Sequence, residues 1–183
     1  PLDRRVVELQ TRHGWDVMVS SQPRWNLVDR HVEDGHLAFC RRAGIGLVVY
    51  SPLAQGVLTN KYAGGARPEG SRATGKFAHF LTSENALTPE HVAAAERLAA
   101  WVARRGLPGP APVALAWVLR HTEVSSAIIG ATSVAQLEEN LRALEVGLDD
   151  DDVAGIEAAI AGAAGPKRRA SKTPAKTPAR RRR

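Results

Sequence analysis

A nearly unbroken apolar run, from Ile45 to Tyr50, sets the strongest limit on how this chain can fold. A run of this length without polar alternation is typical of a parallel strand that is covered on both faces. Shorter β-prone runs stand at 17–20 and 124–129, and helical spacing fills the stretches between the three runs. Because strands that alternate with helices are joined by right-handed crossovers, the sequence predicts an α/β fold with parallel strands.

Helical spacing of apolar residues predicts most of the remaining body. A helical pattern opens the chain and stops at Gly14, and further helices are expected at 33–42, 89–105, 112–121, 132–146 and 149–161. Residues 53–88 are Gly-rich and irregular, and a loop of that length in a compact domain points to a functional segment. A strand that is buried on both faces needs a larger sheet than three strands supply. We therefore expect the body to be part of a larger α/β fold.

The net charge of +6 is unevenly distributed along the chain. Residues 164–183 carry nine Lys and Arg and no acid, which leaves 16 basic against 19 acidic residues in the body, 1–163. Lys, Arg, Pro and Ala at this density cannot build a core, so we expect a disordered tail. The segment 166–183 is similar to the tails of linker-histone-like proteins and predicts nonspecific contact with nucleic acid or another polyanion. A tail that only solvates the protein is the alternative.

The remaining composition excludes several classes of protein. No run of about 18 apolar residues is present, which argues against a membrane span, and no signal peptide is recognisable at the start. The lone Cys40 cannot form an internal disulfide and supplies no thiolate cluster for a metal. We therefore expect a cytoplasmic protein without a metal site.

The carboxyl ends of the three strands are the first candidate for a functional site, because parallel α/β folds bind ligands there. Gln22, Tyr50 and Gly130 stand at these ends. An amide can bond a ligand amide, an aromatic ring can stack on a flat heterocycle, and a glycine before a helix lets the backbone approach a phosphate. Each residue also has a structural interpretation, as a loop cap, a core ring and a simple turn respectively.

The helix expected after Gly130 adds a second candidate. At about 100° per residue, one compact polar face is formed by Thr132, Gln136, Glu139 and Asn140. The opposite stripe is apolar and consists of Val134, Leu137, Leu141 and Leu144. The polar face could grip ribose or adenine, and a solvated face of an amphipathic helix is the alternative.

Five short motifs, in a fixed order and spacing, carry a resemblance to a known family. They are QPRWNL at 22–27, VVYSPLAQGVLTNKY at 48–62, GSR at 70–72, ALAWVL at 114–119 and IIGATSVAQLEEN at 128–140. Together they resemble the C-terminal half of an aldo-keto reductase, in the branch that includes bacterial general reductases and potassium-channel β-subunits. The resemblance implies the C-terminal part of a (β/α)8 TIM barrel, incomplete in this chain, and reduction of aldehydes or ketones with NADPH.

The same resemblance implies roles for the residues at the strand ends. Gln22 would bond the nicotinamide carboxamide, and Tyr50 would stack beneath the nicotinamide ring. The pyrophosphate would be followed by the motif that contains Ser51, Pro52, Leu53, Gln55 and Lys61. Arg72 would lie on the loop that folds over the cofactor. The adenosine end would be held by Gly130, Thr132, Gln136, Glu139 and Asn140.

The chain departs from the family in two ways. Trp25 stands where the family usually has Tyr, and the family's catalytic Asp, Tyr, Lys and His lie on earlier strands that have no match here. The resemblance therefore implies a cofactor-binding half without catalytic residues, either a fragment, a partial gene product, or a half-barrel that dimerises. The alternatives are a catalytically inactive nucleotide-binding or regulatory module, and a nucleic-acid-associated protein that acts through its basic tail.

Overall fold

The computed structural model describes residues 2–83 and 85–162, apart from the side chains of residues 2 and 3, so the expectations for the 164–183 tail lie outside the described residues. Its sheet has three parallel strands, β1 (Ser20–Ser21), β2 (Gly46–Val49) and β3 (Val124–Ala127), in the order β1-β2-β3. Ser21 pairs with Leu47, and Val49 pairs with Ala127. This confirms the predicted α/β fold with parallel strands.

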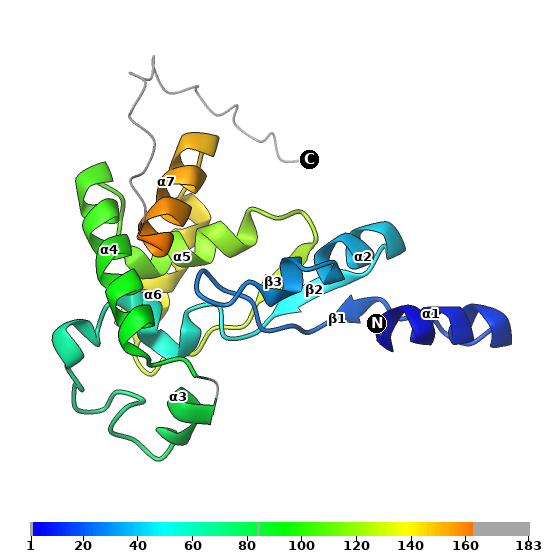
Figure 1. The fold of residues 1–183 in the computed structure, drawn as a ribbon, viewed down its shortest axis with the longest axis horizontal. Helices are drawn as coiled ribbons and strands as arrows, with labels where there is room; N and C mark the ends of the chain where they lie inside the picture. Colours follow the sequence, from blue (N-terminus) through cyan, green and yellow to red (C-terminus); the bar gives the residue numbers. More distant parts are fainter. Residues whose placement is uncertain (1, 84, 163–183) are drawn as a thin grey trace.

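Helices occupy most of the other described residues (Figure 1). The α-helices are α1 (Leu2–His13), α2 (His36–Ala43), α3 (His79–Ser83), α4 (Pro89–Arg105), α5 (Pro110–Leu119), α6 (Val134–Leu141) and α7 (Asp150–Ala161). Short 3₁₀ helices are η1 (His31–Glu33), η2 (Ala54–Thr59), η3 (Ala63–Gly65) and η4 (Arg142–Glu145). Helix α4 has the predicted bounds, because the Thr88 side chain caps its first turn and Gly106 ends it in a left-handed conformation.

The first strand is shorter than predicted, and it begins only at Ser20. The reason is that backbone groups just before it bond to helix α1 instead of to a strand. The Gln10 amide donates to the carbonyl of Asp16 at 2.6 Å, and its oxygen accepts from the backbone N–H of Met18 at 3.3 Å. Local bonding therefore replaces sheet pairing over 16–18.

Burial along β2 corrects the interpretation of the 45–50 run. Leu47 and Val49 are fully buried, but Gly46 and Val48 are only half-buried, and Tyr50 is 37% exposed. The run is therefore covered on one face and not on both, because the described helices pack on the side that Leu47 and Val49 occupy. The second face of the sheet is open within residues 2–83 and 85–162.

The core lies between the sheet and helices α4, α5 and α7. Trp25 and Trp117 are fully buried there, with their rings edge to face at 5.7 Å. Helix α7 packs so closely on α4 that a Cβ placed on Gly155 would lie 2.6 Å from Nε1 of Trp101. Figure 1 shows these helices gathered at one end, with β1 and α1 extending away from them. In the described part of the chain, no helix combines the length and apolar content needed to cross a membrane.

Candidate cofactor site

The three strand ends meet at one edge of the sheet. The backbone N–H of Tyr50 donates to the carbonyl of Pro23 at 3.0 Å, and the N–H of Ile128 donates to the carbonyl of Val49 at 2.8 Å. Gln22 therefore lies beside Tyr50 on one side, and the segment that leads to Gly130 lies on the other. All three residues that follow the strands thus stand on the same rim, as the parallel topology requires.

The chain makes an unusual turn directly after Tyr50. Ser51, Ala54 and Gln55 have φ values of 55°, 48° and 57°, and Gly56 follows at 92°. Residues other than glycine rarely adopt this left-handed backbone conformation, and each such residue costs about 1–3 kcal/mol of folding free energy. The Gln55 amide donates to Oγ of Ser51 at 2.8 Å, which braces the turn across its mouth. Pro52 is buried and Leu53 is half-buried beneath it.

Asn26 holds this turn in place, and the sequence motifs had not assigned it a role. Its buried side chain accepts from the backbone N–H groups of Val28 and Asp29, at 3.0 and 2.9 Å, and donates to the carbonyl of Ser51 at 3.0 Å. It therefore ties the loop after β1 to the loop after β2. Its place inside the QPRWNL motif was the only sequence signal for this function.

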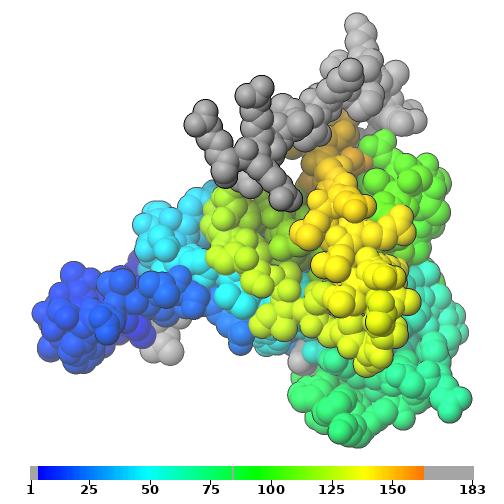
Figure 2. Space-filling model, turned by 180° about the vertical axis from the view of Figure 1, so that it is seen from behind, coloured from blue at the N-terminus to red at the C-terminus, as the bar shows by residue number. Residues whose placement is uncertain are grey.

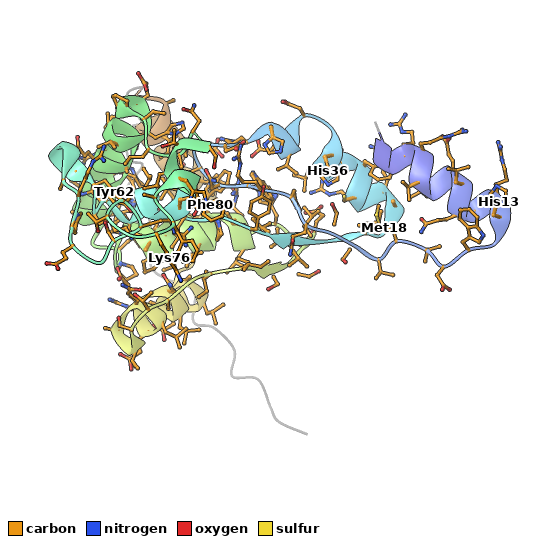
Figure 3. The ribbon with its side chains drawn as sticks, turned by 90° about the horizontal axis from the view of Figure 1, so that it is seen from below. His13, Met18, His36, Tyr62, Lys76 and Phe80 are labelled. Carbon is orange, nitrogen blue, oxygen red and sulfur yellow. The ribbon has the colours of Figure 1, made fainter. Side chains whose placement is uncertain are left out.

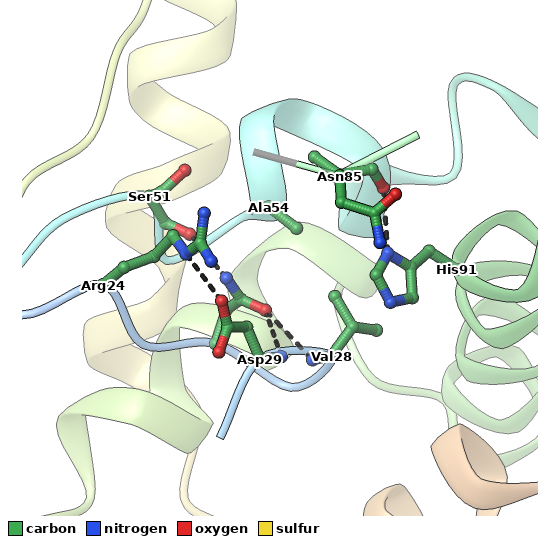
Figure 4. Close-up of a pocket in the computed structure, with 9 residues that line it drawn as sticks. Arg24, Val28, Asp29, Ser51, Ala54, Asn85 and His91 are labelled. Carbon is green, nitrogen blue, oxygen red and sulfur yellow. Dashed lines mark hydrogen bonds and ion pairs between the residues drawn. The ribbon is translucent and has the colours of Figure 1, made fainter. Parts of the chain in front are cut away.

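A polar pocket of about 240 Å³ lies behind the same turn (Figure 4), lined in part by Arg24, Asp29, Ser51 and His91. Arg24 and Asp29 form an ion pair of 2.5 Å across its wall. Burial acts to raise the pKa of Asp29, but the hydrogen bond with His31 and the positive charge of Arg24 outweigh it and lower that pKa. The carboxylate of Asp29 is thus kept ionised and paired with Arg24.

Two cations gather beside η2. Burial lowers the pKa of Lys61, and the positive charge of Arg72 lowers it further. The positive charge of Arg72, which belongs to the irregular loop, therefore acts on the ammonium group of Lys61. A Cβ placed on Gly56 would lie 2.7 Å from Nζ of Lys61, so the ammonium group leans over a turn that only glycine leaves open. Tyr62, labelled in Figure 3, is buried with the Lys61 ammonium 5.4 Å from its ring centroid.

The predicted adenosine face of α6 is only partly presented to solvent. Oε1 of Gln136 accepts from the backbone N–H of Thr132 at 2.9 Å and from its hydroxyl at 3.1 Å, so these two side chains form one unit at the start of the helix. Glu139 is exposed and its carboxylate reaches within 3.6 Å of a Cβ placed on Gly109. Asn140 is buried where α6 packs on α5, and so stands apart from the other three.

Comparison with known proteins identifies the family. The sequence model of the aldo/keto reductase family matches residues 3–161. This chain belongs to the aldo/keto reductase family. Protein Tas of Escherichia coli K12 is 37% identical to it over 154 residues, which are 84% of this chain and 43% of Tas. The L-glyceraldehyde 3-phosphate reductase of E. coli O157:H7 is 35% identical over 163 residues, 86% of this chain and 46% of that protein.

A third relative is named NADH-specific methylglyoxal reductase, from E. coli K12, with 35% identity over 131 residues, 72% of this chain and 38% of that protein. The aldo/keto reductase chain described here therefore spans less than half the length of these relatives. The resemblance found in the five motifs is confirmed. The roles of the individual site residues stay predictions, and Gln22, Tyr50 and Gly130 are the ones that the fold brings to a common rim.

Proposed function

We propose that this chain is the cofactor-binding part of an NADPH-dependent oxidoreductase that reduces aldehydes or ketones to alcohols. On this proposal its sheet is the C-terminal part of a (β/α)8 barrel, and the protein is cytoplasmic. The strand order β1-β2-β3 carries the proposal, because it brings Gln22, Tyr50 and Gly130 to one edge. A dinucleotide lying along that edge would meet an amide, an aromatic ring and a glycine turn in succession.

The chemistry of the donor groups supports an anionic dinucleotide. Lys61 supplies a positive charge beside a turn in which Gln55 and Gly56 are left-handed, and the charge of Arg72 acts on Lys61. Successive backbone N–H groups in such turns form concavities that bind phosphate. Tyr50 is 37% exposed at the end of β2, which leaves part of its ring accessible for stacking. These residues would bind and orient NADPH, which would supply the hydride.

The chain has no match for the family's proton donor. When a carbonyl receives a hydride, negative charge develops on its oxygen, and a positioned general acid contributes about 10²–10⁴-fold to such a step. Within the proposal, that acid and its partners belong to β/α units outside these 183 residues. We therefore expect this chain to bind NADPH without turning over a carbonyl substrate by itself.

Fluorescence titration with NADPH and NADH tests the proposal. We expect saturable binding that weakens in Tyr50→Ala and Gln22→Ala but stays unchanged in Trp15→Ala, which replaces an exposed aromatic ring before the start of β1, away from the rim. Binding that is absent, or that ignores both rim variants, would contradict it. The comparison with NADH also tests the preference for NADPH, since one relative is named as specific for NADH.

A nucleotide-binding regulatory role is the second candidate, because relatives of this chain include a protein named as a probable voltage-gated potassium channel subunit beta, from Oryza sativa. Addition of a carbonyl substrate such as methylglyoxal separates the two once the remaining β/α units are supplied. Oxidation of NADPH supports the enzyme, whereas binding without oxidation supports the regulatory role. Contact of the 166–183 segment with nucleic acid is tested separately, by filter binding of DNA with and without residues 164–183.

A further inference from the structure

The polar pocket behind the turn after β2, here called the Arg24 pocket, is separate from the strand-end rim. Its walls come from the loop after β1, from the turn itself and from the 85–91 segment that begins α4. Among the described residues, Ser51 is the only lining residue that was also assigned to the cofactor. The 131–146 segment, in yellow on the face shown in Figure 2, lines no part of the pocket. A ligand of this pocket would therefore lie away from the rim and from α6.

Backbone strain is concentrated around the Arg24 pocket. Three of its lining residues, Ser51, Ala54 and Asn85, have φ values of 55°, 48° and 50°. The described part of the chain contains five non-glycine residues with positive φ, so more than half of them surround this one cavity. Such residues persist only where the surrounding structure holds them, and they cluster at active sites and ligand clamps. Their position around a cavity therefore indicates a ligand site.

The polar groups of the Arg24 pocket include both donors and acceptors. Figure 4 shows Arg24 and Asp29, joined by their ion pair, on one side and His91 on the other. Nδ1 of His91 lies 3.1 Å from the carbonyl oxygen of Ala86, and because a carbonyl can only accept, Nδ1 is the donor. In the neutral ring Nε2 is then an acceptor. The guanidinium presents only donors and the carboxylate only acceptors, so a ligand that matches all three groups must itself donate and accept.

The charge of the Arg24 pocket decides which class of ligand it can take. The charges of Arg24 and Asp29 cancel, so an anion or a cation would bring a charge that the lining does not balance, which is costly on removal from water. A neutral molecule with several hydroxyl groups avoids this cost, because each hydroxyl both donates and accepts. The lining also contains small apolar side chains, which suit the C–H groups of a sugar ring, namely Val28, Ala54 and Ala86.

We propose that the Arg24 pocket binds a neutral sugar in its ring form, held between the Arg24–Asp29 pair and His91. The proposal goes beyond the proposed function, because a sugar ring that is locked as a glycoside has no carbonyl group to reduce. It also needs nothing from NADPH, so a failure of NADPH binding and a failure of sugar binding are separate results.

Titrations of the full chain with three matched glycosides, followed by ligand-observed NMR, test the proposal. Methyl glucoside is neutral, methyl glucuronide carries a carboxylate at the same carbon, and methyl 6-amino-6-deoxyglucoside carries an ammonium group there. We expect saturable binding of methyl glucoside, about tenfold or more tighter than that of either charged glycoside. His91→Phe keeps an aromatic ring but removes the Nε2 acceptor, and it should weaken the binding of methyl glucoside about tenfold. His13→Phe is the matched control, because it makes the same exchange on α1, outside the pocket, and should leave binding unchanged.

Asp29→Asn adds a readout that a loss of folding cannot imitate. It keeps the size of the side chain but leaves the positive charge of Arg24 unbalanced, so the preference should move from methyl glucoside to methyl glucuronide, by about tenfold or more. The proposal would be overturned by an absence of saturable binding, by equal affinities in His91→Phe and His13→Phe, by a preference of the unaltered chain for either charged glycoside, or by an unchanged preference in Asp29→Asn.

Discussion

Replacing Gly56 with Ala tests the phosphate-binding turn directly. At φ +92°, an alanine costs about 1–2 kcal/mol of backbone strain. In addition, its Cβ would stand 2.7 Å from Nζ and 2.8 Å from Cε of Lys61, so the ammonium group must move away from the turn. Gly64 provides a matched control, because it has φ +61° in the neighbouring 3₁₀ helix but no atom within 4 Å of an added Cβ. Both variants are strained, and only Gly56→Ala displaces Lys61.

The displacement sets the expected loss of affinity. A hydrogen bond to a charged group contributes about 1.5–3 kcal/mol, which corresponds to about 10- to 150-fold in the dissociation constant. We therefore expect Gly56→Ala to weaken NADPH binding by that factor, measured by fluorescence titration, and to lower the midpoint of urea unfolding. Gly64→Ala should lower the midpoint alone. Equal affinities in the two variants would show that Lys61 does not hold the phosphates, and the assignment of this turn would fail.

Three further changes probe the framework around the site. Asn26→Ala removes three hydrogen bonds that include the one to Ser51, so the free energy of unfolding should fall by about 2–4 kcal/mol in urea titrations. Gly155→Ala should cost about 1–3 kcal/mol, because the added methyl group collides with Trp101. Burial lowers the pKa of His121 in the folded chain, so only the unfolded chain binds a proton as pH falls below about 6.5, and stability should decline there.

Each of these has its own control. Glu69→Ala removes an exposed side chain, and Gly147→Ala adds a methyl group with no atom within 4 Å, so both should change stability by less than about 0.5 kcal/mol. His121→Phe keeps an aromatic ring against Trp25 and should flatten the decline below about pH 6.5. An unchanged slope in His121→Phe would remove that histidine from the pH dependence.

The strand pattern could be predicted because it depends on local composition and topology. The three β-prone runs, the helix α4 and the parallel order all follow from periodicity and from Gly and Pro positions. The extent of β1 could not, since it depends on Gln10 bonding across a turn to Asp16 and Met18. The one-sided burial of β2 could not be predicted either. The apolar character of Val48 does not show whether another part of the structure covers its face of the sheet.

The location of the candidate site could also be predicted from the sequence, but the contacts that support it could not. Strand ends are visible in sequence, so Gln22, Tyr50 and Gly130 could be placed on one rim. Asn26 and Gly56 could not be assigned, because their functions depend on contacts with loops that lie far along the chain. Asn140 is buried although Thr132, Gln136 and Glu139 are exposed, because it directly follows Glu139 and consecutive residues of a helix point about 100° apart.

Helix α6 has a polar side that belongs to the proposed cofactor site and an exposed apolar side on which the remaining β/α units of the proposed barrel would pack, and this couples cofactor binding to the complex of the chain with those units. Thr132 and Gln136 stand on its polar side, and Leu137 and Leu141 on its apolar side, within a few residues of one another. Partner units that bind the apolar side fix the helix, so less ordering is left for a nucleotide that binds the polar side. Because such coupling is reciprocal, NADPH should bind the complex more tightly than the chain alone, and NADPH should tighten the complex by the same factor. Equal affinities for NADPH of the chain alone and of the complex would show that the polar side of α6 does not contribute to the cofactor site.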